Sequence, residues 1–356
     1  MQWKYSSYII VAMFIFSACS PEIQKQLNPV PNSYGPTNQL VVVADEDLWE
    51  GAVGDTFRYY FSSAYPILPA PEPIFDLKHF TPLDLETDPL RKQLRNYIFL
   101  ADLKNNASPA ARLLQEDLGA EKMRKAREDV NYSTNVGEDK WAHNQLVVYL
   151  FAYGEEALTS QIKRVFPAVK KRVDKANWDK VDATVYLDGE NNNAKLDLTA
   201  AIGIQMRVPG DYDIVLNEEN TVWLRRETSE SSANLMVHKQ PYTSRTQLTK
   251  DNLKNLRDSI GKKYVSSRIP GTYMQINDVD LPMLSEVKNI NGNYAVEARG
   301  IWELVNDYMG GPFLSYVTVN PKTNELIYID GFIHAPGRKK REYMQGLEHI
   351  IQTVQF

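Results

Sequence analysis

The stretch around Glu297 holds the residues whose types and spacing most favour a recognition site. Glu297 and Arg299 stand two positions apart in an apolar run, so on a strand a carboxylate lies beside a guanidinium on one face. Trp302 and Asp307 follow closely. This group could bind a polar ligand. It could also be a buried ion pair that fixes the register of a sheet, which is the interpretation we prefer.

Arg225 and Arg226 form a second candidate group, directly after Trp223-Leu224. Neighbouring side chains on a strand point to opposite faces, so one arginine can pair with a carboxylate near the core while the other meets solvent or a ligand. A guanidinium suits recognition of carboxylate or phosphate groups. The alternative is an ordinary ion pair on a sheet surface, which we favour.

Local motifs for catalysis or cofactor binding are absent from the sequence. None of the five histidines has a second histidine four positions away, and there is no serine elbow, phosphate loop or dinucleotide fingerprint. Asp45, Glu46 and Asp47 could bind a hard cation, but Trp49 and Glu50 stand where a calcium loop needs an oxygen ligand and a glycine. We therefore predict no metal, no cofactor and no catalytic residue from local patterns. A triad assembled from distant residues stays open.

Cys19 is the only cysteine, and it directly follows a short apolar segment, residues 9–16. A charged start, a short apolar stretch and a small-residue exit are typical of an export signal that is too short to span a bilayer. The arrangement resembles the lipobox of bacterial lipoproteins, although Phe16 stands where leucine is usual. The resemblance implies a signal peptide at residues 1–18 and acylation of Cys19, with palmitate as one acyl group.

Composition sets outer limits on the function. The chain has 356 residues, 43% of them hydrophobic, which is enough for one large or two modest domains. Its net charge of −5 gives no general attraction to nucleic acid. If Cys19 is acylated, the mature body has no thiol, which excludes disulfides, thiolate metal sites and cysteine nucleophiles.

The order of apolar runs predicts the organisation of the chain. Four prolines between residues 20 and 38 indicate an extended tether at residues 19–38. Strand-like runs and helical stripes then alternate in an N-terminal half, residues 39–190, and a C-terminal half, residues 191–356. We predict an α+β fold of largely antiparallel sheets flanked by helices, in two loosely similar halves. The predicted strands of the C-terminal half are 203–208, 221–226, 233–238, 272–276, 294–305, 313–319 and 325–334, with Gly310-Gly311-Pro312 as a backbone reversal.

A basic run, Arg338 to Arg341, precedes the last predicted helix, whose inward-facing apolar stripe is Met344, Leu347, Ile350, Ile351 and Val354. The N-terminus of a helix favours anions, so four cations are poorly placed there. A solvated loop is the ordinary explanation, and the misfit slightly favours a partner.

Several blocks of the sequence stand out together. They are Trp49-Glu50-Gly51 with Gly54-Asp55, Glu72-Pro73-Ile74-Phe75, Arg95-Asn96, Trp223 to Glu227, and Arg299 to Trp302 through Met309 to Phe313. Together they resemble a family of Bacteroidota lipoproteins, domain of unknown function 4837, over roughly residues 39–356. The resemblance implies a lipid-anchored envelope protein and supplies no catalytic residues. Trp49, in the first block, is a further candidate binding residue. The second half is also similar in plan to the PsbP/Mog1-like fold, which mostly serves binding and assembly.

We therefore expect a lipid-anchored binding or assembly-accessory protein of the cell envelope. The alternative is an envelope hydrolase acting on glycan or peptide, with a site built from Arg225 or Arg226, Glu297, Arg299 and Asp307. Expected partners are the membrane, through the lipid anchor, and an envelope protein or glycan, with no nucleic acid. Residues 20–25 lack the acidic run that usually directs surface export in Bacteroidota, which favours the periplasmic face of the outer membrane.

Overall fold

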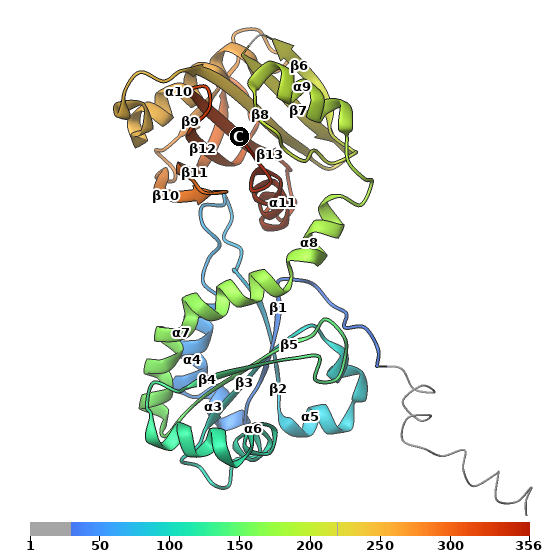
Figure 1. Ribbon diagram of the computed structural model, residues 1–356, viewed down its shortest axis with the longest axis vertical. Helices are drawn as coiled ribbons and strands as arrows, with labels where there is room; N and C mark the ends of the chain where they lie inside the picture. The colour runs from blue at the N-terminus through green and yellow to red at the C-terminus, as the bar shows by residue number, and fades with distance from the viewer. Residues whose placement is uncertain (1–29, 219) are drawn as a thin grey trace, which may run out of the picture. The chain divides into compact units, whose positions relative to one another are not determined.

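The computed structural model describes residues 30–218 and 220–356 (Figure 1). The predicted signal peptide, Cys19 and the first part of the predicted tether lie outside these residues. The described chain forms two compact units, residues 30–63 with 75–176 and residues 64–74 with 177–356. Within the described residues, none of the helices combines the length and apolar character needed to cross a bilayer.

The first unit is a five-stranded sheet with helices between the strands. The strand order is β2-β1-β3-β5-β4. Its elements are β1 (Gln39–Val43), α3 (Glu46–Glu50), α4 (Ala52–Phe61), β2 (Asp76–Phe80), α5 (Pro82–Thr87), the 3-10 turn η1 (Pro89–Gln93), β3 (Asn96–Asp102), α6 (Pro109–Glu128), β4 (Thr134–Glu138), β5 (Leu146–Ala152) and α7 (Glu155–Ala176).

This first sheet is mostly parallel, which corrects the expectation of antiparallel pairing for this half. β1 pairs in parallel with β2 and with β3, and β3 pairs in parallel with β5, while β4 alone is antiparallel. The helices supply the crossovers that parallel neighbours need. β3 and β5 are apolar and buried along nearly their whole length, as expected of strands covered on both faces.

The second unit is built on an eight-stranded antiparallel sheet, as predicted. Its order is β10-β11-β12-β13-β8-β7-β6, and β9 also pairs with β11 (Figure 1). Its elements are α8 (Trp178–Val185), α9 (Asn192–Ile202), β6 (Asp213–Glu218), β7 (Thr221–Glu227), β8 (Ser232–Pro241), the 3-10 turn η2 (Arg245–Leu248), α10 (Lys250–Tyr264), β9 (Tyr273–Asn277), β10 (Leu284–Ile290), β11 (Asn293–Val305), β12 (Gly310–Asn320), β13 (Glu325–His334) and α11 (Arg341–Ile351).

Each face of the second sheet has its own core. On one face, α9 and α11 pack on the strands, with Leu198 and Leu347 among the buried residues. On the other face, α10 packs on the strands, with Leu253 and Phe313 buried. The fold is therefore α+β, with helices covering both faces of this sheet.

A short segment from the first half of the sequence, residues 64–74, belongs to the second unit. Tyr65 and Leu68 join the core beneath α11. We call this segment the strap. The four prolines that predicted an extended loop lie in it, at positions 66, 69, 71 and 73.

Two predicted details of the second half are wrong. Residues 203–208 form no strand and make only an isolated bridge, Gln205 to Gln355, whereas residues 213–218 form β6. Gly310 and Gly311 also do not form the reversal, because they pair with β11 inside β12. Asn306, at a φ of 63°, takes the left-handed position in the turn instead. Gly311 serves close backbone approach, since an added Cβ would lie 1.9 Å from the carbonyl oxygen of Ile333.

Candidate functional site

Glu297 and Arg299 form a closed, buried network on β11. Arg299 donates from Nε to Glu297 Oε1 at 2.6 Å and from Nη1 to the Tyr65 hydroxyl at 3.1 Å. Its Nη2 lies 2.9 Å from Glu348 Oε1 on α11. The Tyr316 hydroxyl donates to the second oxygen of Glu297. The carboxylate–guanidinium pair is therefore saturated by its own chain, which matches the preferred interpretation of a buried ion pair.

The electrostatics of this network keep both charges in place. Burial alone would raise the pKa of Glu297, but the hydrogen bond and charge of Arg299 outweigh it and hold the pKa below its ordinary value. Burial and the charge of Glu348 raise the pKa of the Tyr65 hydroxyl. The ion pair stays ionised and the phenol stays protonated, so none of the three is poised to exchange a proton near neutral pH.

Trp302 and Asp307 do not join this network. Trp302 is buried in the core beneath α10, and its Nε1 donates to the Ile333 carbonyl at 3.2 Å. Asp307 lies in the turn after β11, where its carboxylate accepts from the Tyr308 backbone N–H at 2.7 Å. Trp302 is therefore closed to a ligand, whereas Asp307 is half-buried and lies outside the network.

Arg225 and Arg226 point to opposite faces of β7, as the alternation predicts. Arg225 lies 3.3 Å from Glu227 and is substantially exposed. Arg226 lies 3.2 Å from Asp211 and faces the side of the sheet that α11 covers. Its Nε is buried and has no hydrogen-bond partner among the described residues.

The residues proposed for a hydrolase are dispersed in the second unit. β7 and β11 are separated by β12, β13 and β8, which is four strand spacings or about 19 Å along the sheet. Arg226 therefore cannot act on the same atom as Glu297 and Arg299. No acid/base pair assembled from these residues faces a common space.

Arg226 lines a cavity. The cavity is about 560 Å³ in volume and lies between α11, the end of α8 and the sheet. Val185, Leu347 and Ile350 supply apolar surface. We call it the α11 cavity. Its size is within the range of small-molecule sites.

Both cations and carboxylates line the α11 cavity. The cations are Arg226, Arg338, Lys339 and Arg341, and the carboxylates are Glu72, Glu230 and Glu342. Arg338 pairs with Glu230 at the rim. Lys339 is exposed, and among the described residues no carboxylate forms an ion pair with it. Together with the partly accessible guanidinium of Arg226, this leaves donor capacity for an anion beside an apolar surface.

The strap supplies the acceptors at the start of α11, where the basic run ends. Glu72 accepts hydrogen bonds from the backbone N–H groups of Lys340 at 2.5 Å and Arg341 at 3.2 Å. Arg341 also donates to the Pro73 carbonyl at 2.6 Å. Glu72 thus supplies the negative charge that a helix N-terminus favours. The placement of four cations at a helix N-terminus, which favoured an external partner, is therefore balanced by Glu72 of the same chain.

The end of α8 forms part of the cavity wall, and this helix is held by polar contacts. Asp182 accepts from Arg207 at 2.6 Å and contacts His349 Nε2 of α11 at 2.8 Å. The bonds from Arg207 lower the pKa of Asp182. Trp178 packs on the His349 ring at a centroid distance of 4.2 Å. These contacts position Thr184 and Val185 at the cavity wall.

Trp49, the remaining predicted binding residue, is buried in the first unit. Its ring stacks on His79 at 4.9 Å between centroids, and the Arg58 guanidinium lies 4.7 Å from the Trp49 ring centroid. Asp45 accepts from the backbone N–H of Ala110 at 3.0 Å and from the Ser108 hydroxyl, at the start of α6. Trp49 and the first acid of the Asp45-Glu46-Asp47 run are therefore committed to internal contacts.

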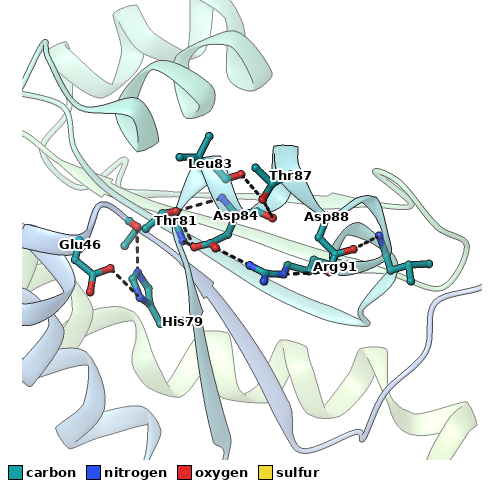
Figure 2. Close-up of polar contacts among 10 residues, drawn as sticks. Glu46, His79, Thr81, Leu83, Asp84, Thr87, Asp88 and Arg91 are labelled. Carbon is teal, nitrogen blue, oxygen red and sulfur yellow. Dashed lines mark hydrogen bonds and ion pairs between the residues drawn. The ribbon is translucent and has the colours of Figure 1, made fainter.

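Further polar contacts near the end of β2 also stay within the chain (Figure 2). Thr81 and Asp84 form a reciprocal cap at the start of α5, and Arg91 donates to Asp84 at 2.6 Å. Glu46 lies 3.8 Å from His79. Across the described ranges, no three or more His, Cys, Asp or Glu side chains are grouped to hold a metal ion.

Sequence reasoning missed most of the residues that build the α11 cavity. Leu347 and Ile350 belong to the predicted apolar stripe of the last helix, so periodicity marked this helix as buried but did not indicate a cavity. Val185 and Glu72 come from distant segments with no local signal. The basic run 338–341 was the signal that could have found the site, because Arg338 and Lys339 lie at its rim.

Two protein-family models match this chain, and the boundary between them lies close to the boundary between the two compact units, at residues 176 and 177. Residues 190–353 match a domain of unknown function, DUF4837. Residues 33–183 match a second domain of unknown function, DUF8532. The expected DUF4837 resemblance is thus confirmed for the second half, and the first half matches a separate family model. Among curated proteins, none matches this sequence.

Comparison with solved structures finds distant similarity. The Ran-binding protein Mog1p of Saccharomyces cerevisiae matches with 9% identity and a TM-score of 0.28, over 43% of this chain and 89% of Mog1p. A protein from Bacteroides thetaiotaomicron matches with 11% identity and a TM-score of 0.23, over 43% of this chain and 44% of that protein. Neither match carries functional information for this chain.

Proposed function

We propose that this chain, whose second half carries a DUF4837 domain, is a binding module for a small anionic ligand with an apolar portion. The ligand would occupy the α11 cavity. The observation that supports this is the placement of Arg226, Arg338 and Lys339 beside the apolar side chains of Val185, Leu347 and Ile350 in one space of about 560 Å³.

The chemistry of the cavity favours an anion over a neutral ligand. Arg226 pairs with Asp211 at 3.2 Å, but 30% of its side chain stays accessible, so its guanidinium can also donate to an anion in the cavity. A phosphate or carboxylate would accept from Arg226 and gain attraction from Lys339 at the rim. An attached apolar chain would lie on Leu347 and Ile350, where its burial is favourable.

A titration with three matched probes tests the ligand class. We expect n-decyl phosphate to bind more tightly than inorganic phosphate, which lacks the chain, and than decanol, which lacks the charge. Isothermal titration calorimetry of the purified protein with each probe gives the comparison. Equal affinity for decanol and decyl phosphate, or no binding of either, would contradict the proposal.

We also propose that Cys19 anchors the protein to a membrane through lipid, at the periplasmic face of the outer membrane. The support is the sequence before Cys19 and the absence of an acidic run after it. One acyl chain binds a bilayer only marginally, whereas several hold firmly, at about 0.8 kcal/mol per buried methylene. An envelope protein or glycan is then the class of partner within reach.

Metabolic labelling tests the anchor, and surface labelling tests the side of the membrane. Radiolabelled palmitate should enter the wild-type protein and not the Cys19→Ala variant. An impermeant amine-reactive reagent should leave the protein unlabelled in intact cells and label it in lysed cells. Palmitate in the variant would refute the anchor, and labelling in intact cells would refute the periplasmic location.

A further inference from the structure

The two terminal strands of the second sheet differ in how they meet solvent. At one end, β6 carries a register shift between Ile214 and Leu216 and is flanked by the acids Asp213 and Glu218. A bulge and like charges are the usual protections of an edge strand. At the other end, β10 pairs with β11 over seven consecutive residues with no interruption. β10 therefore has no bulge, and its Glu286 and Lys288 carry opposite charges, where β6 carries like charges.

Side chains along β10 are exposed for most of its length. Residues 284–287 are all exposed, and Val287 keeps 63% of its surface accessible. An exposed, regular edge strand is a template for pairing with another strand.

The hairpin geometry indicates which backbone groups of β10 point outward. β10 and β11 are joined by Asn291 and Gly292, with φ angles of 47° and 88°, a two-residue turn in which both φ angles are positive. The flanking residues Ile290 and Asn293 then form a hydrogen-bonded pair, and such pairs alternate along the ladder. Residues 286 and 288 therefore direct their backbone groups to β11, while residues 285, 287 and 289 offer theirs to solvent.

The charges on β10 are self-complementary. Glu286 and Lys288 lie two positions apart, with a separation of 2.7 Å between carboxylate and ammonium. In an antiparallel pair of identical strands centred on Val287, each Glu286 stands opposite the Lys288 of the other copy. A pair centred on residue 286 would place glutamate against glutamate, and one centred on residue 288 would place lysine against lysine. Opposite charges directly across two strands stabilise pairing, and like charges oppose it.

We propose that the β10 edge is the self-association surface of this protein, and that a second copy pairs there antiparallel about Val287. In this arrangement the outward backbone groups of Val287 bond to those of Val287 in the second copy, and those of Ser285 bond to Asn289. The two eight-stranded sheets then become continuous across a two-fold axis. The surface is independent of the α11 cavity, so the dimer and the proposed ligand site can fail separately.

Charge reversal tests both the surface and the register. Sedimentation velocity of the purified protein over a range of concentrations should show a monomer–dimer equilibrium. Glu286→Lys and Lys288→Glu should each lower the association constant about tenfold or more, because each single change creates two like-charge pairs per dimer. The double variant Glu286→Lys/Lys288→Glu should restore association. Asp213→Lys on the β6 edge, a matched control, should leave it unchanged.

Different outcomes contradict the surface and the register. A monomer at every concentration overturns the proposal, and so does a dimer that none of the β10 variants weakens. Loss of association in the double variant as well as in the singles refutes pairing about Val287. Circular dichroism of each variant shows that the fold is retained, and Val287→Asp gives a second disruption that leaves both native charges in place and should also weaken the dimer.

Discussion

Glu72 caps the helix that begins at Arg341, although 269 positions separate the two residues. The carboxylate bridges two backbone N–H groups at the start of α11. Through this contact the strap holds the helix that forms one wall of the α11 cavity. The geometry of the proposed ligand site therefore depends on a residue far from it in the sequence.

Removing this cap should loosen α11. Glu72→Ala leaves two helix N–H groups without their acceptor and removes an anion from the positive end of the helix, at a cost of about 1–2 kcal/mol. Hydrogen-exchange mass spectrometry of peptides from residues 341–351 should show faster exchange. The matched control is Glu342→Ala, an exposed acid in the first turn of the same helix, which should change exchange little. Equal effects of the two variants would exclude the cap as the cause.

Breaking the ion pair on β11 should be more costly. Arg299→Met leaves Glu297 buried without its counter-charge, and loss of one partner from a buried pair costs about 3–5 kcal/mol. Arg225→Met removes an exposed arginine from the same sheet and should cost under about 1 kcal/mol. Urea denaturation, monitored by hydrogen exchange in residues 293–305, measures the loss of unfolding free energy in each variant. A small effect of Arg299→Met would mean that water, and not protein, surrounds Glu297.

The cap of α5 should make the first unit sensitive to acid. Hydrogen bonds from Thr81, and then from Arg91, lower the pKa of Asp84 to about 2. Because the folded pKa lies below the unfolded value of about 3.9, the stabilisation is present above pH ~4 and is lost as pH falls toward 2. Asp84 is partly exposed, so the contribution is under about 1 kcal/mol. The stability difference between wild type and Asp84→Asn should therefore shrink as pH falls, and a constant difference would refute this origin.

The predictable parts of this structure are those with local causes. Alternation placed Arg225 and Arg226 on opposite faces of β7, and periodicity marked the buried stripe of α11. The parallel pairing of the first sheet was not predicted. β3 and β5 are evenly apolar, which is typical of parallel strands, but a fully buried strand shows no alternation from which its pairing can be read.

The strap and the cavity lay beyond sequence reasoning for a different reason. The bond between Arg299 and Tyr65 joins residues 234 positions apart, and no local pattern encodes such a contact. Gly310-Gly311-Pro312 misled because glycine serves both turns and close backbone approach, and only the neighbouring strand decides between them.

That second use of glycine is itself testable. Gly311→Ala would place a Cβ 1.9 Å from the backbone oxygen of Ile333, which must move, so we expect destabilisation of about 2 kcal/mol or more. At Gly346 on α11 the Cβ would meet only Val185 Cγ2, at 3.8 Å. Gly346→Ala should therefore stabilise the helix by about 0.5–1 kcal/mol. Thermal unfolding of the two variants should shift in opposite directions, and a shift in the same direction would contradict this account of β12.

The most direct test of the proposed ligand site compares two adjacent arginines. Arg226→Gln removes the charge that lines the α11 cavity, whereas Arg225→Gln removes an equal charge from the opposite face of the same strand. Calorimetric titration with n-decyl phosphate should show affinity about 10- to 100-fold weaker for Arg226→Gln and unchanged for Arg225→Gln, because a charge-assisted hydrogen bond contributes about 1.5–3 kcal/mol. Equal affinity in the two variants would contradict the proposal that the α11 cavity binds anions.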